Sequence, residues 1–305
     1  MTVGGERGQA TLFSAVFLMA LLGISTLVLD VGSWYRADRQ AQSTADAVAL
    51  AGAQALPDDS AAALALALEY AGKNGGGVTA ADVSFSAGVV AGDTISVDFH
   101  RSAQGFFSKV IGIDSIEVHA RAAARAGLPG RARWVAPMVV HYQHPMLIGC
   151  GGGPCFGPGN QTQLPYDKLG APGAFGMINL VQGSNGTVGT STLAEWILTG
   201  FDQYLPLGLY NSDPGAKFNS SQIRDALTAR IGTVVLFPVY RTLTGSGQNA
   251  EYDIIGWVGF HLTGLDVHGT TATLDGYFTS VVWDGIQSQS ASQPDFGVRA
   301  ISLIE

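Results

Sequence analysis

The longest apolar stretch of the chain runs from Gly8 to Leu29 without a charged residue. As an α-helix it would be about 33 Å long, enough to cross the roughly 30 Å hydrocarbon core of a bilayer. Trp34 and Tyr35 follow it, where amphipathic rings favour the membrane interface. A cleaved secretory signal is the alternative, but its apolar core is only about 7–15 residues long. The run therefore predicts a retained membrane anchor.

The helical pattern continues beyond the apolar run as far as Leu56, and Pro57 marks its predicted end. Four alanines spaced four residues apart form a smooth ridge along one face of this helix. They are Ala41, Ala45, Ala49 and Ala53. Small residues at that spacing let another element approach closely. The ridge can pack on the protein's own sheet or on helices of partner proteins, and both interpretations stay open.

Residues 58–130 predict a small α+β unit. Residues that favour helix N-caps precede an apolar helical segment, and alternation of apolar and polar residues predicts half-buried strands after it. The predicted elements are a helix over 60–75, strands over 83–88, 94–100 and 115–127, and a helical segment over 102–113. His100 and His119 fall in the strand patterns, and we expect them to face solvent.

Residues 131–305 are rich in glycine and in strand patterns. The predicted strands lie over 135–142, 174–181, 232–240, 252–262, 271–283 and 296–304. Helical spacing occurs mainly over 192–201 and 220–231. A mainly antiparallel β-rich domain is expected here, and the fold class of the whole chain is α+β.

Composition limits the classes of partner. The 305 residues carry a formal net charge of −8, and only 13% are charged. Nucleic-acid binding is not expected, because no basic stripe is present to displace counterions.

The two cysteines, Cys150 and Cys155, are separated by glycines and a proline. This spacing favours a small disulfide loop, since the glycines let the chain fold back to the separation that a disulfide needs. A disulfide also suits an oxidising exterior. A zinc site with His141 and His144 is an alternative, although the spacing differs from familiar zinc motifs. Free thiols are the third interpretation.

Motifs of catalysis are absent from the sequence. It has no Gly-x-Ser-x-Gly elbow, no P-loop and no dinucleotide fingerprint. We therefore expect a protein that is not an enzyme and has no catalytic, cofactor or metal site.

A set of residues around the apolar run resembles the N-terminal signature of the TadE/TadG-like family of Flp (Tad) pilus assembly. In order along the chain they are Arg7, Gly8, Asp30, Gly32, Tyr35, Gln42, Ala45, Asp46, Ala47, Ala49, Leu50, Ala51 and Gly52. Both halves of the signature occur in the right order and spacing.

The resemblance implies an accessory or minor subunit in the assembly of a Tad/Flp-type adhesive pilus. Processed members of the wider pilin group carry a glutamate five residues after the cleavage-site glycine, and Phe13 stands at that position after Gly8. This departure favours the permanently anchored TadG-like type. A long helix followed by a sheet is also the outline of a pilin-like subunit. The alternative function is a surface-displayed adhesin or glycan-binding module.

The resemblance and the anchor together imply three domains: an anchor and extended helix (1–57), a small α+β unit (58–130) and a β-rich extracytoplasmic domain (131–305). We expect a single-pass protein of the cytoplasmic membrane, with its N-terminus inside and its C-terminal bulk outside. Residues 8–34 would contact lipid. Pilins or other Tad assembly proteins are the expected partners, and oligomers are possible.

Asp30 has two interpretations. Its carboxylate can lie among lipid headgroups, or it can pair with a basic group on a partner protein.

Overall fold

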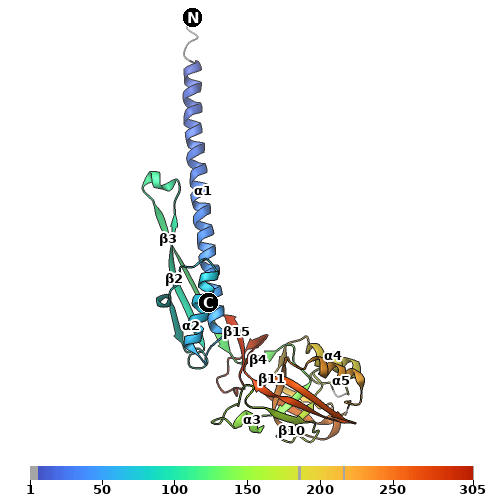
Figure 1. Cartoon of the computed structure of the whole chain (residues 1–305). Coiled ribbons are helices and arrows are strands. Elements are labelled where there is room, and N and C mark those ends of the chain that lie inside the picture. Colours follow the sequence, from blue (N-terminus) through green and yellow to red (C-terminus); the bar gives the residue numbers. More distant parts are fainter. Residues whose placement is uncertain (1–5, 185–186, 216, 305) are drawn as a thin grey trace. The chain divides into compact units, whose positions relative to one another are not determined.

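The computed structural model describes residues 6–184, 187–215 and 217–304, with the side chains of residues 6–8 and 111 left out. The chain forms two compact units (Figure 1). The first comprises Met1–Arg125 with Leu303–Glu305, and the second comprises Ala126–Ser302. The predicted boundary after residue 57 is therefore not a unit boundary, because the long N-terminal helix packs into the same unit as the residues that follow it.

The first unit is one long helix packed against a second helix and an antiparallel sheet. Its elements are α1 (Glu6–Ala53), α2 (Ser60–Lys73), η1 (Ala80–Asp82), β1 (Val83–Ser86), β2 (Thr94–Gln104), η2 (Ser108–Ile111) and β3 (Ser115–Gly127). Asp59 caps α2 by accepting a hydrogen bond from the Ala62 amide. β2 pairs with β1 and, from Thr94↔Arg125 to Gln104↔Ser115, with β3. The predicted strand over 115–127 is confirmed.

Helix α1 has two halves with opposite surroundings. Beyond Ala41 one face is buried against α2 and β2, whereas the apolar half is exposed along its length. Within the described residues, α1 is the one helix long and apolar enough to cross a membrane, and none of its most apolar segment is buried. Figure 1 shows the β2–β3 hairpin running alongside α1, with its tip beside the helix.

The second unit is β-rich, as expected. Its longer elements are β5 (Met138–His141), β10 (Val234–Thr244), β11 (Glu251–His268), β12 (Thr271–Thr279), β15 (Val298–Leu303), α4 (Thr190–Thr199) and α5 (Ser221–Ala229). Its shorter elements are β4 (Pro129–Ala132), α3 (Pro145–Ile148), β6 (Thr162–Pro165), β7 (Phe175–Met177), β8 (Leu205–Pro206), β9 (Gly208–Asn211), η3 (Gly247–Asn249), β13 (Val281–Val282) and β14 (Gly285–Gln287).

The main sheet of this unit has the strand order β6-β12-β11-β10-β5-β7, and β9 also pairs with β11. All pairs are antiparallel except β10 with β5. Buried aromatic side chains fill its core, among them Phe237 and Phe260, whose rings stack at a centroid distance of 5.3 Å. Both predicted helices are confirmed as α4 and α5.

Candidate functional site: the Asp30 junction

Asp30 lies at the end of the apolar run and points into the first unit, where only 1% of its surface is exposed. Its carboxylate accepts hydrogen bonds from three consecutive backbone amides of the loop between β2 and β3. The Phe106 amide lies 2.9 Å from Oδ1, the Phe107 amide 3.0 Å from Oδ2, and the Ser108 amide 2.5 Å from Oδ2. The carboxylate therefore joins the helix to the loop 76–78 residues further along the chain.

This partner differs from both sequence interpretations of Asp30. Successive amides that face one point form a concavity that binds anions, and a carboxylate fits it as a phosphate would. Such charge-assisted bonds are stronger than neutral ones. Asp30 is therefore satisfied within its own chain, by neutral donors that no charge pattern reveals.

The loop has a compact shape of its own. The Gly105 amide donates to the Asp114 carbonyl at 2.9 Å, and the Ser108 hydroxyl donates to the Ile113 carbonyl at 2.9 Å. The helix predicted over 102–113 is wrong. β2 continues to Gln104, and only the short 3₁₀ turn η2 forms before Gly112 ends it in the left-handed region, at φ 87°.

A groove of about 470 Å³ runs between this loop and α1. Its lining residues come from both elements: Leu22, Gly23, Thr26, Leu27, Asp30, Phe107, Ser108 and Val110. The Thr26 hydroxyl donates to the Gly23 carbonyl of its own helix at 2.8 Å. Since that hydroxyl and the Asp30 carboxylate are both bonded within the protein, the groove presents mainly apolar atoms.

The alanine ridge is buried inside the first unit. Ala41, Ala45, Ala49 and Ala53 are all fully buried, and α1 packs there on α2 and β2. The intramolecular interpretation of the ridge therefore describes this structure, and the four side chains are not accessible to a partner.

Two further signature residues lie where α1 meets the rest of the first unit. The Gln42 side-chain amide donates to Asp46 Oδ1 at 2.8 Å and to the Arg121 carbonyl on β3 at 2.7 Å. At Gly52 a Cβ atom would lie 2.4 Å from Ile95 Cδ1 and 3.1 Å from the Ala63 carbonyl oxygen. Only glycine fits this crossing without displacing a neighbour.

The remaining signature residues make fewer specific contacts. Ala51 is buried, and Ala47 and Leu50 are half-buried. Gly32 has nothing within 4 Å of a Cβ atom built on it, and Tyr35 is 58% exposed, with its hydroxyl accepting a hydrogen bond from Arg39. The side chain of Arg7 and the surroundings of Gly8 lie outside what the structure describes.

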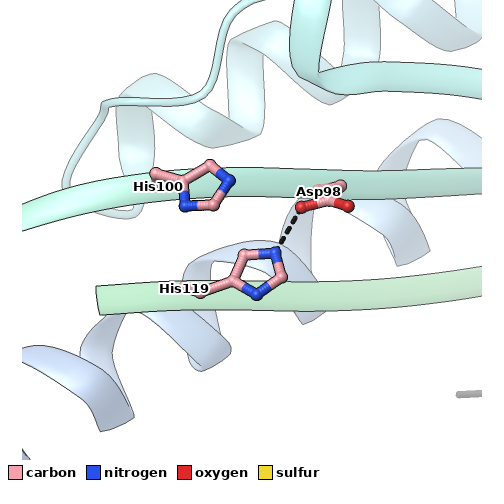
Figure 2. A group of neighbouring side chains, drawn as sticks. All are labelled: Asp98, His100 and His119. Atoms are coloured by element: carbon pink, nitrogen blue, oxygen red, sulfur yellow. Dashed lines mark hydrogen bonds and ion pairs between the residues drawn. The ribbon is translucent and has the colours of Figure 1, made fainter. Parts of the chain in front are cut away.

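A second cluster lies on the exposed face of the hairpin, where Asp98 and His100 of β2 meet His119 of β3 (Figure 2). The two imidazole rings stack at a centroid distance of 4.4 Å, and His119 Nε2 lies 2.5 Å from Asp98 Oδ1. Hydrogen bonds from His119 and from Arg121 hold the pKa of the Asp98 carboxyl below its usual range. Both histidines are exposed, as expected.

The potential ligand atoms of this cluster lie within 4.8 Å of one another. Two imidazoles and a carboxylate are zinc ligands. A cation there would have to replace the bond between His119 and Asp98, next to the guanidinium of Arg121, which is 2.9 Å from Asp98 Oδ2. The three side chains and Arg121 are linked to one another by ring stacking, a hydrogen bond and an ion pair.

Cys150 and Cys155 form a disulfide, with their Cα atoms 5.2 Å apart, so neither sulfur is free for zinc. The predicted disulfide is thus confirmed. Of the two histidines proposed for the zinc alternative, His144 is buried, and its Nδ1 accepts a hydrogen bond from the Met146 amide at the start of α3. Burial lowers the pKa of His144 to about 4.

Comparison with known proteins identifies one segment of the chain. Residues 8–55 match the family model described as putative Flp pilus-assembly TadE/G-like. No curated protein and no solved structure matches the chain. The match confirms the resemblance and supports a role in Tad pilus assembly. It includes Asp30, Gln42 and Gly52, but none of the hairpin residues that they contact.

Proposed function

We propose that this chain, whose residues 8–55 are a TadE/G-like domain, is a non-enzymatic, membrane-anchored accessory or minor subunit in the assembly of a Tad-type pilus. The observation that carries the proposal is the contrast between the two halves of α1. Within the matched residues 8–55, the apolar half of α1 is exposed, whereas the half beyond Ala41 is packed into a folded unit.

The exposed half favours a lipid environment. Its large apolar side chains, from Leu12 to Leu29, are each between 44% and 67% exposed. A continuous apolar surface of this length is costly in water and favourable in a bilayer. Phe13 at the position of the processed pilins' glutamate supports a retained anchor over a cleaved one.

An outward orientation of the C-terminal bulk is part of the proposal. It is supported by the Cys150–Cys155 disulfide, because such bonds persist in oxidising compartments. Protease treatment of spheroplasts tests it with an epitope fused after Glu305. We expect the epitope to be digested, and its protection until the membrane is dissolved would reverse the orientation.

Gene deletion in the source bacterium tests the role itself. Loss of surface pili by electron microscopy is expected, with recovery on expression of the full chain. A variant with Leu18→Arg and Leu21→Arg, each costing about 3 kcal/mol at the centre of a membrane helix, is expected not to restore pili. His268→Ala, on the exposed surface of β11, is the matched control and should restore them.

The same experiment distinguishes the assembly role from the alternative function, a surface-displayed adhesin or glycan-binding module. Normal pili with reduced attachment to cells or glycans would refute the assembly role and favour a surface-displayed adhesin. Normal pili and normal attachment would refute both.

A further inference from the structure

We propose that the loop joining β2 and β3, residues 105–114, inserts its apolar tip into the membrane interface beside α1, and that the groove between them holds a phospholipid acyl chain. This second membrane contact rests on the proposed anchoring of α1. It assigns a ligand class, the apolar part of a phospholipid, to a loop outside the segment that matches the family.

The loop exposes apolar side chains that its own fold cannot cover. Val110 is 88% exposed and Phe106 70%, and Phe107 and Ile113 are also exposed. Hydrogen bonds close the loop at both ends, from the Gly105 amide to Asp114 and from the Ile113 amide to the Ser108 carbonyl. The loop therefore cannot fold back to hide these groups, and a clustered apolar surface of this kind marks a binding site.

The position of the loop along α1 matches the membrane boundary. The groove extends from Asp30 to Leu22. Leu22 lies about 10 Å below Leu29, the last residue of the apolar run, at 1.5 Å per residue. Interfacial elements bury their apolar faces about 5–10 Å into the headgroup and acyl boundary. If α1 spans the bilayer, the loop tip lies at that depth.

Asp30 fixes this depth. Its carboxylate binds the Phe106, Phe107 and Ser108 amides, so the loop cannot slide along the helix without breaking charged hydrogen bonds. Those amides would otherwise be unpaired donors in a region poor in water, where an unsatisfied backbone group is costly. Lys109, exposed on the same turn, can extend its ammonium towards anionic headgroups.

Lipid is the occupant that the surroundings favour. The helical wall of the groove belongs to the segment that is exposed and apolar enough to span a membrane, so the groove opens onto the surface proposed to face acyl chains. A protein partner would have to displace lipid from the exposed face of α1 and from the groove, whereas lipid can cover both surfaces at once.

Spin-label accessibility tests the proposal on the full chain in vesicles of phosphatidylethanolamine and phosphatidylglycerol. Since the two native cysteines are joined, a nitroxide can be attached to a single new cysteine. Val110→Cys carries the test probe. Ala91→Cys, exposed in the turn beyond the other end of β2, roughly 34 Å away along the strand, is the matched control. Leu18→Cys reports whether α1 itself is inserted.

The proposal expects the Val110 probe to be accessible to oxygen and several-fold less accessible to a water-soluble nickel chelate than the Ala91 probe. Asp30→Asn should raise the chelate accessibility of the Val110 probe, and no change would overturn the role of Asp30 in holding the loop.

Three results would overturn the lipid contact in different ways. If the Leu18 probe is protected from the chelate but the Val110 probe is accessible to it, α1 is inserted in the membrane and the loop does not contact lipid. A Val110 probe inaccessible to both reagents would show that protein and not lipid covers the loop, which in these vesicles means a second copy of the chain. A Leu18 probe open to the chelate would remove the anchor as well, and with it the proposed function.

Discussion

Two helical glycines of the first unit should respond in opposite directions to the same substitution. Gly52→Ala places a Cβ atom 2.4 Å from Ile95 Cδ1, and Ile95 is fully buried, so in a close-packed core its methyl group can move away only by displacing other buried groups. The backbone oxygen of Ala63, 3.1 Å away, must shift as well. Overpacking of this kind costs about 1–3 kcal/mol, whereas alanine in place of glycine stabilises a helix by about 1 kcal/mol. The clash wins, and we expect a net loss of about 1 kcal/mol.

Gly72 in α2 is the matched control, because nothing lies within 4 Å of a Cβ atom there. Gly72→Ala should stabilise the unit by up to about 1 kcal/mol, since only the helix term applies. Ile95→Val removes the clashing methyl group, so the double variant Gly52→Ala/Ile95→Val should be more stable than the two single changes predict by about 1–2 kcal/mol.

Denaturation of the full chain in detergent, followed by hydrogen exchange of peptides from α1 and α2, measures these changes for the first unit alone. Equal stabilisation by both Gly→Ala changes, with no coupling to Ile95, would refute the close helix crossing at Gly52.

Three more predictions concern buried polar groups and the disulfide. Asp30→Asn should accelerate hydrogen exchange of the Phe106–Ser108 amides while leaving α2 unchanged, and equal protection in both proteins would contradict the carboxylate clamp. Cys150→Ser with Cys155→Ser should cost the second unit about 2 kcal/mol in thermal unfolding, since the closed loop is short; a far larger loss would show a wider structural role. His144 binds its proton in the unfolded chain near pH 6.5 but in the folded chain only near pH 4, so stability should fall by up to about 3 kcal/mol as the pH drops between these values. His144→Asn should flatten that slope, and an unchanged pH profile would exclude His144 as its source.

Elements in which apolar residues repeat with a clear helical or strand period were predictable from the sequence. The alternation over 115–127 predicted β3 to the residue, and the helical spacing over 192–201 and 220–231 predicted α4 and α5. The helix predicted over 102–113 does not form, and the reason is physical. Its apolar residues repeat as in a helix, but three of its amides bind a carboxylate from a distant part of the chain, and Gly112 ends the turn.

The candidate site was predictable only in part. The sequence singled out Asp30 and the alanine ridge, because a charge after an apolar run and small residues four apart can be recognised in the sequence itself. The groups that these residues contact in the fold could not be predicted. Backbone amides carry no sequence signal, and a ridge of small residues packs equally well on its own unit or on another chain.

The contacts of the signature residues explain why α1 depends on the hairpin that follows it. A helix consisting only of residues 8–55 would leave the Asp30 carboxylate without its three donors, next to the apolar segment where an unpaired charge is most costly. It would also leave Gln42 without the Arg121 carbonyl and expose the alanine ridge. The residues that satisfy these groups all lie outside the matched segment, on β2, β3, the loop between them and α2. The matched segment is therefore only part of a folding unit, and variants of the hairpin should disturb the placement of α1 as directly as variants of the helix itself.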